Sequence, residues 1–144
     1  MTISATNQAT AAYSLTAKSP GDYGERCIKI QYTGSLASTL RLYRSSFTGG
    51  SGLDSYIDLT ITRGSGTQAD CSDFSSAASV YSGTLAAFPT SYASGVSLVN
   101  SSGSATWSQN DAVTYRVKAQ LQSNTAAQGL GTGTHAFTWE AHNQ

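Results

Sequence analysis

The chain has 144 residues, of which only 11% are charged, and its eight Lys and Arg balance eight Asp and Glu to a formal net charge of zero. Without a basic surface there is no electrostatic footprint for nucleic acid or for an anionic membrane, which argues against both classes of partner. No apolar run approaches the roughly 20 residues that cross a bilayer. We therefore expect a single domain over residues 1–144, without a membrane span.

The first half of the chain consists of short runs with alternating apolar and polar side chains. The alternation is found at residues 12–17, 26–33, 39–44 and 56–62. Successive side chains of a strand point to opposite faces of a sheet, so each run is predicted to be a half-buried strand. Turn residues separate the runs at residues 19–22, 34–35 and 63–66.

The middle of the chain is less regular. We predict a strand at residues 80–85 and one or two short helical turns in the 69–99 region, around Pro89. The many short strands, with Gly and Ser turns between them, indicate an all-β fold, either an antiparallel sandwich or a barrel.

The last third carries the two clearest strand patterns, at residues 112–121 and 135–141. Strict alternation over ten residues is typical of a strand with one face in the core. The side chains predicted to share a face are Val113, Tyr115, Val117, Ala119 and Leu121 in the first run, and Phe137, Trp139 and Ala141 in the second.

Two cysteines, Cys27 and Cys71, are too far apart in sequence to form a CxxC pair. Their even number favours a disulfide, with two reduced and buried thiols as the alternative. A disulfide would close a long loop and stabilise the fold by about 3–4 kcal/mol. The first residues lack a basic and then apolar signal segment, but a secreted protein without its leader would look the same.

Residues with catalytic potential are few. The two histidines, His135 and His142, are seven positions apart, so on one continuous strand they point to opposite faces. No HExxH or GxSxG motif occurs, and the acidic pairs Asp54/Asp58 and Asp70/Asp73 lack the spacing of a calcium loop. We expect no catalytic residues, no metal site and no cofactor, and hence a protein that is not an enzyme.

Aromatic residues offer a binding hypothesis. Tyr43, Tyr56 and Trp107 do not all fit the inward phase of their strands, and exposed rings on a flat sheet would stack on sugars. The alternative is that these rings close the ends of the sandwich. The triplet that begins at Asn100 (Asn-Ser-Ser) also matches an N-glycosylation acceptor.

Several segments together resemble the TasA/camelysin family, especially its actinobacterial members. They are residues 19–22 (Ser-Pro-Gly-Asp), 27–34 (Cys-Ile-Lys-Ile-Gln-Tyr-Thr-Gly) and 40–43 (Leu-Arg-Leu-Tyr). Residues 110–116 and 136–141 are similar to the paired closing strands of that family, and residues 70–71 and 81–85 fit the region between. The likeness covers residues 12–144.

This resemblance implies a secreted jelly-roll domain that assembles with other copies of itself into extracellular fibres of a biofilm matrix or cell surface. Family members usually begin with a signal peptide and an apolar N-terminal strand that completes the sheet of a neighbouring subunit. The present chain opens at Thr2, inside or just after that strand. Some members are described as metalloproteases, but no matching zinc motif is present here.

Three functions are therefore expected, in descending order. The first is a structural subunit that polymerises by β-strand addition. The second is a secreted polysaccharide-binding module that uses Tyr43, Tyr56 and Trp107. The third, a metalloprotease, has no support from the residues.

Overall fold

The structure is a computed structural model and describes residues 3–5 and 19–144. The strand predicted at residues 12–17 lies outside the described residues. The described strands are β1 (Ile3–Ala5), β2 (Tyr23–Tyr32), β3 (Ser38–Thr48), β4 (Ile57–Ser65), β5 (Ser75–Thr84), β6 (Val96–Leu98), β7 (Thr106–Trp107), β8 (Ala112–Leu121) and β9 (Thr134–Asn143). The two 3₁₀ turns are η1 (Leu53–Tyr56) and η2 (Thr125–Ala127).

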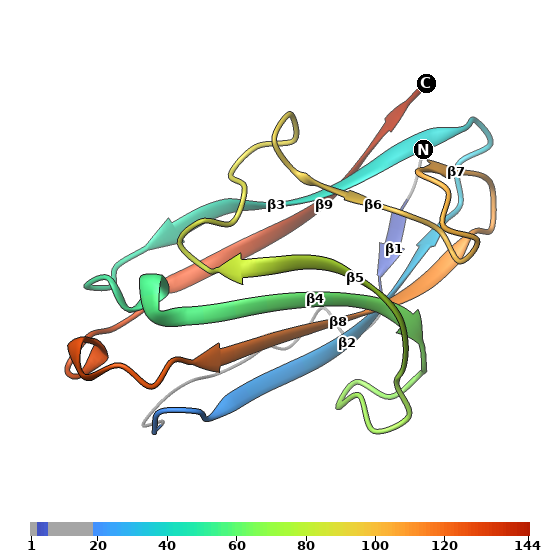
Figure 1. The fold of residues 1–144 in the computed structure, drawn as a ribbon. Helices are drawn as coiled ribbons and strands as arrows, with labels where there is room; N and C mark the ends of the chain where they lie inside the picture. The colour runs from blue at the N-terminus through green and yellow to red at the C-terminus, as the bar shows by residue number, and fades with distance from the viewer. Residues whose placement is uncertain (1–2, 6–18) are drawn as a thin grey trace.

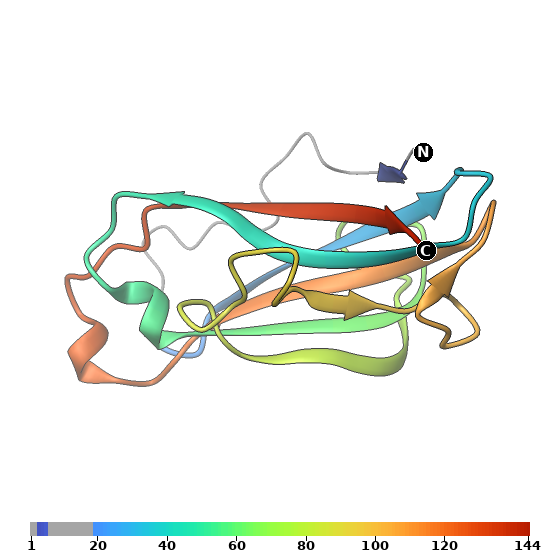
Figure 2. The same ribbon diagram turned by 90° about the horizontal axis from the view of Figure 1, so that it is seen from above.

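The strands form two antiparallel sheets packed face to face (Figures 1 and 2). One sheet has the order β1-β2-β8-β4-β5. In the other, β3 is central, with β9 along one edge and β6 and β7 along the opposite edge. The prediction of an all-β antiparallel sandwich is thus confirmed, and each predicted strand within the described residues corresponds to an observed one.

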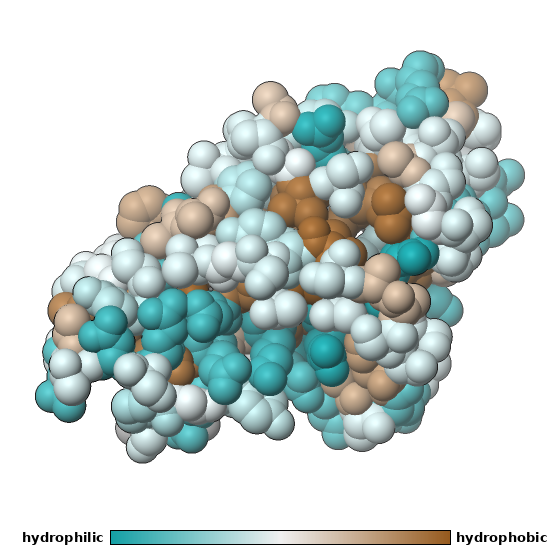
Figure 3. Space-filling model, viewed as in Figure 1, coloured by the Kyte–Doolittle hydropathy of each residue, from teal (hydrophilic) through white to brown (hydrophobic). Residues whose placement is uncertain are grey.

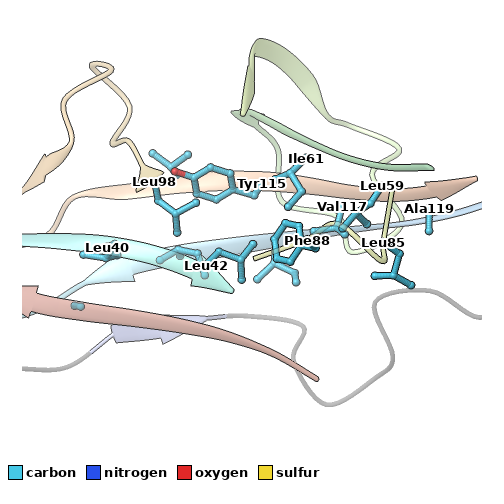
Figure 4. Close-up of a cluster of buried hydrophobic side chains, with 14 of the residues drawn as sticks. Leu40, Leu42, Leu59, Ile61, Leu85, Phe88, Leu98, Tyr115, Val117 and Ala119 are labelled. Carbon is cyan, nitrogen blue, oxygen red and sulfur yellow. The ribbon is translucent and has the colours of Figure 1, made fainter. Parts of the chain in front are cut away.

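The core lies between the sheets, where the inward residues of each strand meet. Figure 4 shows Phe88 between Leu42 of β3 and side chains of β4 and β8 such as Ile61 and Val117, with Leu85 toward one end of the cluster. Removing each large apolar side chain from water contributes about 1.5–3 kcal/mol. Fully buried members are Tyr32, Leu40, Ile57, Leu59, Ile61, Leu85, Leu98, Trp107 and Tyr115.

Apolar atoms also reach the surface on one side of the sandwich. Figure 3 shows them near the middle of the face where β5 and β6 approach each other. Val80 and Val96, which are only partly buried, pack against the core on these two strands. β5 and β6 belong to different sheets and do not pair with each other along this side.

The helical turns are not where they were predicted. Residues 69–99 contain no 3₁₀ or α-helical segment, only single hydrogen-bonded turns such as Phe88 N–H to Leu85 O (3.2 Å). The physical reason is at Pro89, which has no N–H to continue a helix. Its carbonyl accepts a hydrogen bond from the Arg44 amide at 2.7 Å, which draws this segment along β3.

The predicted disulfide between Cys27 and Cys71 is confirmed, with Cα atoms 5.2 Å apart. Cys71 belongs to the β4–β5 loop, and Cys27 lies on β2, so the bond ties this loop to the first sheet. Two hydrogen bonds hold the same loop, Cys27 N–H to Ala69 O (3.0 Å) and Thr114 Oγ1 to Gly66 O (2.8 Å). A disulfide fits a protein from an oxidising compartment, such as the cell exterior.

Candidate functional site

The outer edge of β9 is the candidate site with the most distinctive geometry. Among the strands that the structure describes, only β3 pairs with β9. Gln144 N–H donates to Ala37 O at 3.1 Å, and this pair fixes the phase of the ladder. Because hydrogen-bonded pairs alternate in an antiparallel ladder, the backbone groups of Thr138 and Glu140 point toward β3. Those of Phe137 and Trp139 point away from it, along the outer edge.

The inner face of β9 is apolar but incompletely covered. The Phe137 ring packs edge-on against Phe88, with centroids 5.4 Å apart, and Trp139 tilts against Tyr115 at 5.9 Å. Both side chains are nevertheless only half-buried, and Ala141 is the buried apolar residue of this face. The edge therefore combines outward-pointing backbone groups with an accessible apolar row, which is the chemistry that an added strand requires.

The outer face of β9 carries a polar network. Tyr43 of β3 donates its hydroxyl to Glu140 Oε2 at 2.6 Å, and His142 Nε2 lies 2.7 Å from Glu140 Oε1. The hydrogen bond from Tyr43 is the main cause that lowers the pKa of Glu140, and the same bond raises the pKa of Tyr43. The Tyr92 ring stacks on His142 with centroids 3.6 Å apart. These contacts tie β9 to β3 and to the 89–95 segment.

The two histidines lie on opposite faces of β9, as the sequence predicts. His135 contacts Arg44 and the Phe47 ring, whereas His142 contacts Glu140 and Tyr92. The contacts of His135 depend on the β3–β9 register, which no local sequence pattern predicts. Glu140 and His142, in contrast, are two positions apart on the same face of β9.

The three aromatics predicted to bind a ligand do not come together. Tyr43 is half-buried on the outer face of β3, and Tyr56 is half-buried at the end of η1. Trp107 is fully buried, and its Nε1–H donates to Leu98 O at 3.0 Å. Its ring is part of the core and has no face to offer a ligand, because the strand β7 turns it inward against β3.

The predicted glycosylation acceptor has a structural role. The Asn100 side chain is buried, and its Oδ1 accepts hydrogen bonds from Ser102 and Ser104 amides at 3.1 and 2.9 Å. Its Nδ2 donates to Thr106 O and to Asp111 Oδ2 at 3.3 and 3.0 Å. Attachment of a sugar would therefore require the loop between β6 and β7 to open.

The described residues contain no group of three or more His, Cys, Asp or Glu side chains that would hold a metal ion. Asp73 instead organises its own loop by accepting hydrogen bonds from the amides of Thr67 and Gln68, which lower its pKa. A cavity of about 420 Å³ near η1 and η2 is lined by residues such as Leu53, Leu121 and Leu130, and none of its lining side chains is titratable. None of the helical segments in the described chain is long and apolar enough to cross a membrane.

No protein-family model and no curated protein matches the sequence. The resemblance to the TasA/camelysin family therefore stays a prediction.

Proposed function

We propose that this protein is a secreted structural subunit that assembles with copies of itself by β-strand addition at the outer edge of β9. The observation that carries the proposal is the combination, on this one strand, of backbone groups that point away from β3 and the half-buried apolar row of Phe137 and Trp139. An added strand would satisfy the backbone groups and bury the apolar row at the same time.

The composition of β9 supports this role. Proteins usually protect long edge strands with prolines, bulges or inward charges. β9 contains no proline, Glu140 is its single carboxylate, and its pairing with β3 is regular from Phe137 to Asn143. The low overall charge further weakens repulsion between copies.

The Cys27–Cys71 disulfide supports an extracellular or cell-surface location, because such bonds persist in oxidising compartments. The resemblance to the TasA/camelysin family points to the same setting, a fibre of a biofilm matrix or cell surface. Under this proposal the protein has no catalytic role.

Electron microscopy and light scattering of the purified protein test the proposal. Thr138→Lys places a cation on the edge strand β9. In a fibre, this charge would lie next to the strand of the neighbouring subunit that pairs with β9. We expect this variant to remain monomeric under conditions in which the wild type forms fibres.

Gln120→Lys is the matched control, because Gln120 lies on β8, which is paired on both sides, and its neighbours across the ladders are Tyr23 and Asp58. This variant should polymerise as the wild type does. A wild type that stays monomeric at every protein and salt concentration would contradict the proposal, as would equal polymerisation of both lysine variants.

Polysaccharide binding is a second candidate because Tyr43 is held on the exposed face of the second sheet by its bond to Glu140. A pull-down with insoluble polysaccharides would test it. Binding that is lost in Tyr43→Ala but kept in Tyr56→Ala would favour this function, and no binding by the wild type would dismiss it.

A further inference from the structure

A buried cation lies beside the first half of β9. Arg44 is 7% exposed, and its guanidinium lies 4.9 Å from the Phe47 ring centroid. Its anionic partner Asp54 is 3.8 Å away, and the Leu85 carbonyl is 3.5 Å away, so both are at the outer limit for these contacts. The Nε atom has no hydrogen-bond partner within the described part of the chain. Arg44 therefore has few close partners for a buried charge, so the loss of any one of its contacts would be costly.

His135 supplies the shortest of these polar contacts. Its Nδ1 lies 3.3 Å from Arg44 Nη1, and its Nε2 lies 2.8 Å from Thr132 O. A guanidinium only donates hydrogen bonds, so Nδ1 must accept, and a carbonyl only accepts, so Nε2 must donate. Both contacts are satisfied by the neutral imidazole with its proton on Nε2. The doubly protonated ring would direct an N–H at a buried cation.

We propose that His135 is a pH-sensitive latch that holds the first half of β9 against β3 and opens when its Nδ1 atom is protonated. Histidine is the side chain whose charge ordinarily changes between pH 5 and 8. Protonation turns the Arg44–His135 contact from a hydrogen bond into a repulsion between two cations. Because Arg44 is buried, the imidazole is the group that moves.

The other charged and titratable groups around this contact do not replace it. Asp54 of η1 lies 3.8 Å from Arg44 Nη1. Burial raises the pKa of Tyr81 on β5, and the Arg44 charge offsets part of that rise. Neither forms a described contact with His135. A protonated His135 therefore gains no described anionic partner.

Movement of His135 affects the whole start of β9. The preceding loop packs tightly on the end of β3, where a side chain at Gly133 would clash with the Thr48 carbonyl. Ser51 N–H donates to Gly131 O at 2.8 Å, and Gly131 N–H donates to Ser51 Oγ at 2.8 Å. When the imidazole moves away from Arg44, its hydrogen bond to the Thr132 carbonyl is lost as well. The loop that precedes β9 then loosens together with the start of the strand.

The other end of β9 provides an internal comparison. His142 Nε2 lies 2.7 Å from Glu140 Oε1, so protonation there strengthens a contact with a carboxylate. Acid is therefore expected to loosen the first half of the strand while the second half stays in place.

Hydrogen exchange measured by NMR on the monomer at low concentration tests the latch. In the wild type, the protection factors of the Ala136 and Thr138 amides should fall by up to about tenfold when the pH is lowered from about 7.5 to about 5.5, because histidine side chains in general gain a proton across this range. Those of Glu140 and His142 should change little. His135→Asn keeps an acceptor close to Arg44 but cannot be protonated in this range, and it should abolish the pH dependence.

His142→Asn is the matched control, and it should keep the wild-type response of Ala136 and Thr138. The latch is wrong if the protection of these amides does not change with pH in the wild type, or if it falls equally in His135→Asn. The measurement does not depend on the proposed function. A monomer with the expected exchange pattern that never polymerises would overturn only the proposed function, and fibres without that pattern would overturn only the latch.

Discussion

β8 and β9 have similar patterns of alternating side chains but different places in the fold. Both are ten-residue strands with strict alternation and an aromatic residue in the inward row, Tyr115 in β8 and Trp139 in β9. β8 lies between β2 and β4, and its inward side chains are all buried. Among the described strands β9 pairs with β3 alone, and its inward aromatics Phe137 and Trp139 are only half-buried.

Alternation of side chains therefore indicates which face of a strand is apolar, but it does not indicate how many other strands pair with that strand. A central strand and an edge strand with one face on the core give the same period of two. What separates them is where the rest of the chain goes. The outer edge of β9 is thus a property of the topology, and it is this property that makes β9 the candidate site.

The largest effect should come from the central strand. Tyr115→Ala removes a fully buried ring whose hydroxyl donates to Val99 O at 2.6 Å. We expect it to lower the free energy of unfolding by about 3–5 kcal/mol, measured by urea denaturation. Tyr115→Phe keeps the ring and leaves only the Val99 carbonyl without its donor, so it should cost about 1–2 kcal/mol. Equal losses in the two variants would contradict this account of the core.

The disulfide gives the next largest effect, because it ties the β4–β5 loop to β2, next to β8. The bond joins residues separated by 44 positions, and its removal in Cys27→Ser/Cys71→Ser should cost about 2–4 kcal/mol in urea denaturation. Hydrogen exchange of the same variant should show the loss at Cys27 N–H, which is bonded to Ala69 O. Unchanged stability would mean that the loop is held by its hydrogen bonds alone.

The fold class, most strand positions and the disulfide were predictable because each depends on a local signal. Alternation located β8 at its observed limits, and an even cysteine count favoured pairing. β6 lies in the region that was predicted only as irregular, because three residues carry too little pattern. The prediction that Trp107 faces a ligand was wrong for a related reason. β7 has two residues, which is too short for alternation to show which side chain points into the core.

The candidate site was less predictable than the fold. Every residue other than proline has a backbone N–H and a C=O group, so these groups give no signal in the sequence. Only the pairing of the strands decides which of them lie along an edge. The contact between Arg44 and His135 depends in addition on the shift in the β3–β9 register between Arg44 and Ser46, which no sequence pattern predicts.

A smaller effect is expected at the edge strand. Trp139→Ala removes a ring that is only half-buried, whereas the Tyr115 ring is fully buried, so less buried apolar contact is lost. We expect a loss of about 1–2 kcal/mol in urea denaturation. Polymerisation should be affected more strongly than stability, because the ring belongs to the row that an added strand would cover. A loss as large as that of Tyr115→Ala would show that β9 behaves as a central strand.

The smallest effect concerns the outer face of β9 in acid. The Tyr43 hydroxyl and then His142 lower the pKa of Glu140 from its ordinary value of 4.5, so the folded state favours the ionised carboxylate. Stability from this group is present above about pH 4.5 and is lost as the pH falls through the lower value in the folded protein. Denaturation of wild type and Glu140→Gln at pH 7 and at acidic pH should show a difference that shrinks with acid. Tyr43→Phe should reduce that pH dependence, because it removes the main cause of the shift. If the difference in stability between the wild type and Glu140→Gln instead persisted in acid, Glu140 would act through packing and not through its charge.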